Sequence, residues 1–246
     1  MPLITLNILQ GQETPYPAAD INIVIDVIRA FTVSNIAFSR GVQEIFLVNT
    51  VAEAFALRAQ DPGILLAGEI DALPIAGFDL DNSPHTMAQA DVGGKSLVQK
   101  TSNGVKATLL ALNAKTVMVT GLSNARTSAL HARRLAQEMA AKPGQGARHC
   151  TINVIASHPE YDDDVAVADY IRGIILGSHD VSLAQAQHRI QTSRPALKFL
   201  DPAQPVFKAE DIPFCLQEAP AEFVMVVQGS QPLPKIVRQT AALSLD

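Results

Sequence analysis

The segment 21–41 constrains the fold of this chain more strongly than any other. It begins with INIVI, a β-branched apolar run that is typical of a buried strand. Asp26 ends this run with a charge, and Arg29 follows three positions later. From Thr32 onward, apolar residues recur at helical spacing until a glycine closes the pattern. The segment therefore predicts a strand, a short charged loop and a helix.

The same succession of strand and helix recurs along the chain. Alternating strands and helices are typical of a mostly parallel sheet, so we predict an α/β fold. Two closing strands are expected at 211–216 and 222–228, as an antiparallel hairpin on an edge, with a peripheral tail to residue 246. The apolar runs that we assign to the other strands cover residues 3–9, 43–48, 64–67, 95–100, 116–120 and 151–156.

The composition is that of a well-buried globular chain. Of the 246 residues, 48% are hydrophobic and 17% are charged, which suits one large α/β domain. We therefore expect a single domain over residues 1–246. Two sub-lobes divided near 142–150 are the alternative, because KPGQGAR in that region is the one linker-like stretch.

Charge and hydropathy argue against several kinds of partner. The net charge is -5, the pI is near 5.7 and no basic block occurs, so nucleic acid is not an expected partner. No apolar run approaches the roughly 20 residues that cross a bilayer, so no membrane partner is expected. Cys150 and Cys215 lack metal-ligand spacing, and we interpret them as buried thiols of a cytoplasmic protein, with a disulfide as the alternative.

Charged residues gather where the predicted strands end. Asp26 follows the strand at 21–25, and Glu69 follows the strand at 64–67. Because parallel strands end at the same edge of a sheet, we expect these two carboxylates to lie close together. A carboxylate suits a metal ion, and the guanidinium of Arg29 suits an anion. The alternative is an ordinary ion pair between Asp26 and Arg29.

The segment 70–90 has no periodicity and carries many side-chain oxygens. Asp79, Asp81, Asn82 and Ser83 are the types of ligand that a hard divalent cation prefers. These residue types also cap turns, which is an equally good interpretation. Long irregular loops in compact domains are usually functional or disordered, and we favour an ordered loop at the site.

Two predicted helices begin after small polar residues. Thr101–Gly104 precedes one helix, and Gly121–Asn124 with Arg126 precedes the other. Free N–H groups and the helix dipole favour an anion at such a position, and glycine permits close approach. A well-capped helix with nothing bound is the alternative. The glycine spacing of a nucleotide-binding P-loop is absent.

Acidic residues also precede the helix predicted from residue 165. Asp162, Asp163 and Asp164 are favoured at a helix start by the dipole, which makes a structural role the default. Three in succession exceed what capping requires, so we predict a metal role for one or two of them. His158 is a weaker candidate for a general acid. A metal site beside an anion pocket indicates phosphoryl chemistry on a small molecule.

Five motifs span nearly the whole chain. They are VIDVIRAFT at 24–32, GFDLDNSP at 77–84, TSNGVKA at 101–107, YDDDVAVADYI at 161–171 and DIPFCLQ at 211–217. In this order they resemble the 2-phosphosulfolactate phosphatase family. The resemblance implies a three-layer α/β/α fold with a mixed, mostly parallel central sheet. It also implies Mg²⁺-dependent hydrolysis of the phosphate ester of a small sulfonated hydroxy acid, a step toward coenzyme M.

The resemblance, read with the strand ends, indicates roles for particular residues. Metal-activated water is the expected nucleophile, and an aspartyl-phosphate at Asp26 is the alternative. The catalytic candidates are Asp26, Arg29 and Glu69, and the Mg²⁺ candidates are Asp26, Glu69, Asp79, Asp163 and Asp164. The expected substrate-binding residues are Asn82, Ser83, Thr101, Ser102, Asn103, Gly104, Ser123 and Arg126, the last two from their helix start alone.

Three places depart from the family pattern, and one of them is the segment 100–102, KTS, which replaces a threonine run. Phe31 stands where a small hydroxyl residue is expected, and Ile70 stands where the family often has arginine. The lost cation leaves the substrate open, since a charged contact contributes about 1.5–3 kcal/mol. We expect a homodimeric Mg²⁺-dependent phosphatase with a small anionic phosphorylated substrate. The alternatives are a relative that binds another anionic metabolite without turnover, and a purely structural subunit.

Overall fold

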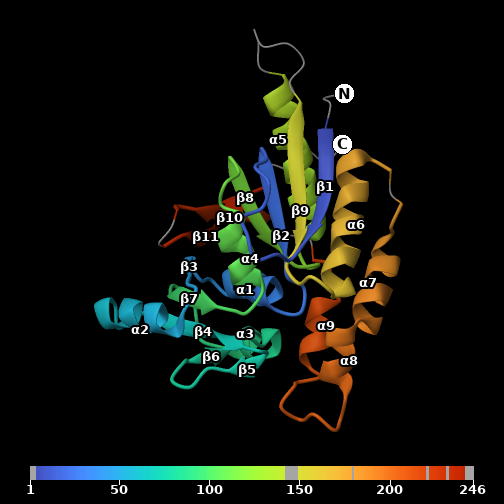
Figure 1. Ribbon diagram of the computed structural model, residues 1–246. Helices are drawn as coiled ribbons and strands as arrows, with labels where there is room; N and C mark the ends of the chain where they lie inside the picture. Colours follow the sequence, from blue (N-terminus) through green and yellow to red (C-terminus); the bar gives the residue numbers. More distant parts are fainter. Residues whose placement is uncertain (1–3, 142–148, 179, 220–221, 231–232, 242–246) are drawn as a thin grey trace.

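One mixed sheet organises the part of the chain that the computed structural model describes, residues 4–141, 149–178, 180–219, 222–230 and 233–241. Helices cover both faces of this open sheet, so the predicted three-layer α/β/α class is confirmed (Figure 1). Its strands are β1 (Ile4–Gln10), β2 (Ile21–Ile25), β3 (Glu44–Leu47), β4 (Leu65–Ile70), β5 (Leu73–Pro74), β6 (Leu80–Asp81), β7 (Ser96–Lys100), β8 (Thr116–Thr120), β9 (Cys150–Ala156), β10 (Phe223–Gln228) and β11 (Lys235–Thr240). The helices are α1 (Ala30–Ser39), α2 (Val51–Gln60), α3 (Pro84–Gln89), α4 (Gly104–Leu110), α5 (Ala125–Ala140), α6 (Asp162–Leu176), α7 (Leu183–Thr192), α8 (Arg194–Leu200) and α9 (Asp211–Cys215).

Two large apolar cores lie on opposite faces of β2. Ile21, Ile23 and Ile25 pack in one core with residues of α5 and α6. Val24 packs in the other core with residues of α1 and α4. Successive side chains of a strand point to opposite faces, so a strand covered on both sides needs an uninterrupted apolar run. The INIVI run that predicted this strand therefore reflects burial on both faces.

The sheet contains two parallel groups joined by an antiparallel pair. Its order is β1-β9-β2-β8-β10-β11-β3-β7-β4-β5, with β6 beside β4. β1, β9, β2 and β8 are mutually parallel, and so are β3, β7, β4 and β6. β10 and β11 pair antiparallel with each other and with the neighbouring strands of the two groups. The C-terminal strands therefore join the two halves of the sheet.

This arrangement corrects the prediction for the C-terminal region. The segment 211–216 is the helix α9 and not a strand, because a short apolar run fits a buried helix as well as a strand. The partner of β10 is instead β11, which the sequence placed in a peripheral tail. Residues 242–246 of that tail lie outside the described residues, as does most of the predicted sub-lobe division near 142–150.

The twist of the sheet brings its two parallel groups to one cleft. In a flat sheet, β4 would run opposite to β2, because β10 and β11 reverse the strand direction between them. Six steps separate β2 from β4, and a twist of about 20–25° per step turns the direction by about 120–150°. Figure 1 shows the result, with β2 and β9 running steeply and β4 and β7 running across them. The carboxyl ends of both groups can therefore face one cleft.

Several local predictions from the sequence are confirmed elsewhere in the fold. The predicted capping box of α2 is present, with Thr50 Oγ1 accepting from the N–H of Glu53 and Glu53 accepting from the N–H of Thr50. The segment 70–90 is ordered as predicted, although it forms β5, β6 and α3 in place of one long loop. Cys150 and Cys215 are both buried, as expected. No helix within the described ranges has the length and apolar character needed to span a bilayer.

Candidate active site

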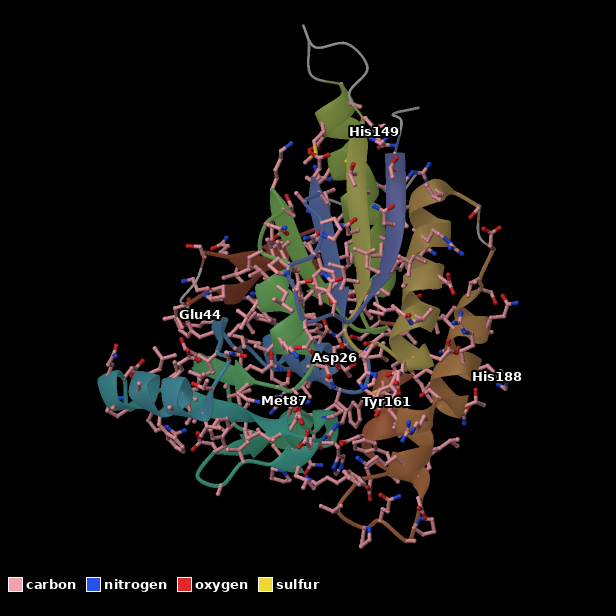
Figure 2. All side chains as sticks on the ribbon, viewed as in Figure 1. Asp26, Glu44, Met87, His149, Tyr161 and His188 are labelled. Atoms are coloured by element: carbon pink, nitrogen blue, oxygen red, sulfur yellow. The ribbon has the colours of Figure 1, made fainter. Side chains whose placement is uncertain are left out.

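A cleft of about 700 Å³ opens where the two halves of the sheet converge. Asp26 and Arg29, which follow β2, and Glu69, at the end of β4, all line it. The expected approach of Asp26 to Glu69 is therefore present in the structure. Figure 2 shows Asp26 in the middle of the molecule, below β2, with Tyr161 at the start of α6 toward the other wall. Segments far apart in sequence thus form one site.

Three aspartates form a buried acid cluster beside the cleft, namely Asp26, Asp163 and Asp164. Each side chain is more than nine-tenths buried. Asp26 accepts a hydrogen bond of 2.9 Å from the N–H of Ala30, at the start of α1. Asp164 accepts from the N–H of Val27 at 2.8 Å and from the hydroxyl and N–H of Ser157, at 2.8 and 3.0 Å. Asp163 Oδ1 is buried and has no hydrogen-bond partner.

Burial and mutual repulsion make this cluster a poor place for negative charge. Burial is the largest cause that raises the pKa of Asp26 and Asp163 to about 7, and of Asp164 to about 8. The charge of Asp164 adds to the rise at Asp26, and that of Asp26 to the rise at Asp163. Near neutral pH the cluster therefore holds a proton or requires a cation, and either property suits acid–base or metal chemistry.

The start of α4 binds the protein's own carboxylates. The N–H of Ser102 donates to Glu69 Oε1 at 2.5 Å, and the N–H of Gly104 bonds to Asp26. A Cβ atom at Gly104 would lie 2.6 Å from Asp26 Oδ2, so this close approach requires glycine. Thr101 Oγ1 accepts from the N–H of Val105 at 3.1 Å. Two of the donors expected to hold a substrate anion, the N–H groups of Ser102 and Gly104, thus bind Glu69 and Asp26 instead.

A tight turn after β4 connects Glu69 to Arg29. Asp71 and Ala72 adopt left-handed backbone, with φ of +53° and +68°. This conformation is uncommon outside glycine. Here it lets the N–H of Ala72 donate to Glu69 Oε2 at 2.5 Å while the carbonyl of Ala72 accepts from Arg29 Nη2 at 3.3 Å. The turn therefore holds the catalytic candidates from both halves of the sheet.

Arg29 pairs with a residue that the sequence did not identify as part of the site. Its Nη1 lies 2.7 Å from Oδ2 of Asp211, in α9, and both side chains are buried. Asp211 Oδ1 also accepts from the hydroxyl of Ser83 at 2.5 Å and from the N–H of His85 at 3.3 Å. The guanidinium carbon of Arg29 is 4.5 Å from the ring centroid of Phe199. The alternative prediction of a simple ion pair between Asp26 and Arg29 is therefore wrong. Ser83, through its hydrogen bond, orients the carboxylate of Asp211.

Apart from His158, the wall formed by the segment before α6 and by α8 was missed from sequence. The rings of His158 and Tyr161 stack in parallel, with centroids 3.4 Å apart. His158 Nδ1 accepts from the N–H of Glu160 at 3.1 Å, which places the ring proton on Nε2. Burial lowers the pKa of His158, and the charge of Arg194 lowers it further against an opposing effect of Glu160. His158 is thus a neutral hydrogen-bond donor near pH 7, and a poor general acid.

Sequence comparisons agree with this geometry. The chain matches the family described as 2-phosphosulpholactate phosphatase over residues 8–230. It is 50% identical over 231 residues to a probable 2-phosphosulfolactate phosphatase of Bacillus subtilis (strain 168), an alignment that covers 94% of this chain and 97% of the relative. The chain belongs to the 2-phosphosulfolactate phosphatase family.

Other relatives carry the same description. A probable 2-phosphosulfolactate phosphatase of Thermus thermophilus is 30% identical over 234 residues, which cover 92% of this chain and 94% of the relative. One of Deinococcus radiodurans is 39% identical over 127 residues, about half of each chain. The resemblance inferred from five motifs is confirmed, and membership of the 2-phosphosulfolactate phosphatase family makes this chain a phosphoric monoester hydrolase.

Several of the expected site residues lie apart from the cleft of this family member. Asp79 forms an ion pair with Arg58 and accepts from the N–H of Leu66 at 2.7 Å. The metal role expected for Asp79 is therefore not supported, because its carboxylate serves the link between α2 and β4. Ser123 and Arg126 do not line the cleft, whereas Asn82, Ser102 and Asn103 do. Asn82 Oδ1 is also buried without a partner.

The residues of the cleft fit a hard cation in part. No group of three or more His, Cys, Asp or Glu side chains is arranged as a ready metal site within the described chain. Mg²⁺, however, commonly uses one or two protein carboxylates together with water and substrate phosphate. Asp26 lines the cleft, and Asp163, whose Oδ1 has no partner, lies close enough behind it for their charges to interact, so the two carboxylates are a donor set of that kind.

Proposed function

We propose that this chain hydrolyses 2-phosphosulfolactate to sulfolactate and phosphate, in a Mg²⁺-dependent reaction of the coenzyme M biosynthesis type. The observation that carries the proposal is the buried acid cluster of Asp26, Asp163 and Asp164 beside a cleft that Asp26 and Arg29 both line. Three carboxylates that repel one another favour a cation, and an arginine in the same cleft favours a phosphoryl group. The names of the relatives, all probable 2-phosphosulfolactate phosphatases, support the substrate.

Asp26 and Asp163 are the residues that we assign to Mg²⁺. When bound, the ion supplies Lewis acidity toward a phosphoryl oxygen. Asp164 is saturated by Val27 and Ser157, so its role is to fix the first turn of α6 against the end of β2. Both carboxylate oxygens of Glu69 likewise accept hydrogen bonds, from the N–H groups of Ser102 and Ala72, so we assign Glu69 a positioning role.

Arg29 orients and stabilises the phosphoryl group in this proposal. Asp211 and the carbonyl of Ala72 engage part of its guanidinium, and Arg29 also lines the cleft. A guanidinium fixed in this way stabilises charge that develops on phosphoryl oxygens without reorganising during the reaction. The carboxylate of Asp26 lines the cleft and can accept the proton of the attacking water. His158 donates its Nε2–H toward the bound ester.

A direct test measures phosphate release from 2-phosphosulfolactate, with Mg²⁺ and with a chelator. The proposal expects release with Mg²⁺, its loss with the chelator and recovery when Mg²⁺ is restored. Release that is indifferent to the chelator would contradict the metal role. No release from this ester would contradict the substrate.

The same reaction can separate two chemical routes. Direct attack by water transfers phosphate without labelling the protein. Attack by Asp26 as a nucleophile would instead leave an aspartyl-phosphate, which a rapid acid quench with ³²P-labelled ester detects on the chain. We favour direct attack by water, because Asp26 is fixed through Ala30 and Gly104 beneath the cleft.

One feature favours a second candidate function. Ile70, at the end of β4 next to Glu69, is 43% exposed where the family often has arginine. The second candidate is a relative that lacks this cation, binds another small anionic metabolite and does not turn it over. Such a protein would show ligand-dependent thermal stabilisation with no phosphate release. Assembly as a homodimer and a cytoplasmic location remain our expectations, and light scattering after size exclusion tests the first.

A further inference from the structure

The wall of the cleft formed by α8 carries two cationic side chains that are not part of the acid cluster or of the Arg29 clamp. Arg194 and Lys198 lie four residues apart, about one turn of a helix, so they share a face. Both side chains line the same cleft as Asp26. In Figure 1, α8 lies on the opposite side of the lower half of the molecule from β4 and β6. The cleft therefore has two cationic positions, Arg29 on one element and this pair on another.

Within the described residues these two cations have no carboxylate partner. Other cationic side chains do have one, as in Lys106 with Glu13 and Lys208 with Asp81. The ammonium of Lys198 instead lies 4.0 Å from the ring centroid of Phe207, a contact that holds it at the wall. In a chain with a net charge of -5, unpaired cations facing one cleft indicate an anionic ligand.

The acidic groups near this pair have other partners. Asp201 lines the same wall, but its carboxylate accepts from the N–H of Ala203 and from Gln204 Nε2, each at 2.9 Å. The volume of about 700 Å³ is within the range that accommodates small organic ligands, and it exceeds the needs of a phosphoryl group alone. Space and charge are thus both present beyond the acid cluster.

We propose that Arg194 and Lys198 form a subsite for a second anionic group of the substrate, a sulfonate or a carboxylate. This inference rests on the proposed phosphatase function and assigns its substrate class, a phosphate monoester that carries a further acid. Arginine presents several donors to an oxoanion, and lysine adds a point charge. An ester of a neutral alcohol would leave both cations without a partner in the cleft and would bind more weakly.

The kinetic signature follows from where the contact lies. The second anion does not change charge in the reaction, so its contacts are equal in the ground and transition states. Loss of such a contact raises KM and leaves kcat nearly unchanged. Because Arg194 is exposed and screened by solvent, we expect about a tenfold effect for each cation.

The first experiment compares three esters on wild type, Arg194→Gln and Lys198→Gln. The esters are 2-phosphosulfolactate, with a sulfonate and a carboxylate; 2-phosphoglycerate, with a carboxylate; and glycerol 2-phosphate, with no second anion. Each variant should raise KM for 2-phosphosulfolactate about tenfold and leave kcat/KM for glycerol 2-phosphate within about twofold. A similar rise in KM for 2-phosphoglycerate would assign the contact to the carboxylate, and an unchanged KM for this ester would assign it to the sulfonate. Parallel changes for all three esters, or no change, would overturn the subsite.

The second experiment does not depend on turnover. Sulfoacetate has a sulfonate and a carboxylate but no phosphate, and it should raise the melting temperature of the wild type but not of either variant. If the wild type hydrolyses no ester and sulfoacetate still stabilises it through these residues, the phosphatase proposal fails and the subsite stands. Absence of stabilisation in the wild type would overturn the subsite. Arg133→Gln in α5 and Lys95→Gln, both outside the cleft, are the matched controls and should behave as wild type.

Discussion

Neighbouring aspartates on one helix have opposite surroundings in this protein. At the start of α6, Asp163 and Asp164 are buried beside Asp26, and neither has an ion pair with a cation of the described residues. Asp162, one residue earlier, is exposed and accepts from Arg189 Nε at 2.9 Å. Asp169, two turns later, accepts from Arg189 Nη1 at 2.8 Å. The same residue type thus serves an uncompensated cluster at the cleft and a compensated network on the surface.

This difference in surroundings distinguishes functional acidic residues from structural ones. A carboxylate with its own cation has its charge balanced at little cost and contributes to stability in a small way. A buried carboxylate among other carboxylates costs stability, so it persists where binding or catalysis needs it. The two groups therefore predict opposite responses to neutralisation.

The largest expected effect is on turnover. Asp26→Asn removes the carboxylate that we assign to the metal and to proton transfer, while an amide oxygen can still accept from the N–H of Ala30. We expect kcat to fall by about 10²–10⁴-fold with thermal stability close to wild type, because relief of repulsion within the cluster offsets the lost hydrogen bond from the N–H of Gly104. Phosphate release and a melting curve on the same sample test this. A variant with unchanged kcat would remove Asp26 from the mechanism.

The next effect concerns the clamp on Arg29. Asp211→Asn takes away the one carboxylate paired with a buried guanidinium. Loss of one partner of a buried ion pair costs about 3–5 kcal/mol, so the midpoint of urea unfolding should fall markedly. Any folded fraction should also have a lower kcat, since Arg29 loses its orientation. Stability close to wild type would mean that Arg29 is solvated or finds another partner.

A smaller effect is the dependence of stability on pH and Mg²⁺. Folding raises the pKa of Asp26, Asp163 and Asp164 from 3.8 to about 7 or 8, so the folded protein binds more protons in between. Their contribution is complete below about pH 4 and is lost as the pH rises through about 8. Mg²⁺ should offset this loss, with a larger increase in melting temperature at pH 8 than at pH 5. Equal shifts at both pH values would contradict binding at the cluster.

The smallest effect is expected on the other side of the comparison. Asp162→Asn removes an exposed carboxylate from Arg189, which keeps Asp169. We expect a loss of about 0.2–1 kcal/mol in unfolding free energy, reduced by salt, and unchanged phosphate release. This variant is also the matched control for Asp26→Asn. A loss of activity here would mean that the acidic run acts as a unit.

The amino-acid sequence by itself determined the local framework and the family. The buried strand 21–25, the capping box at Thr50 and the strand 116–120 follow from periodicity and caps, which act within a few residues. The strand ends also pointed to Asp26 and Glu69, because parallel strands share an edge. Five ordered motifs were enough for the family resemblance.

Only the tertiary structure decided which charges are paired. The bond between Arg29 and Asp211 joins residues 182 positions apart, and no local pattern indicates it. The same holds for the cations of α8 and for the division between Asp162 and Asp163. The strand β11 shows the same dependence for the backbone. Its short polar run lies in the middle of the sheet because β10 and β3 pair with it on either side. Pairing depends on proximity and desolvation, and both arise only once distant segments pack together.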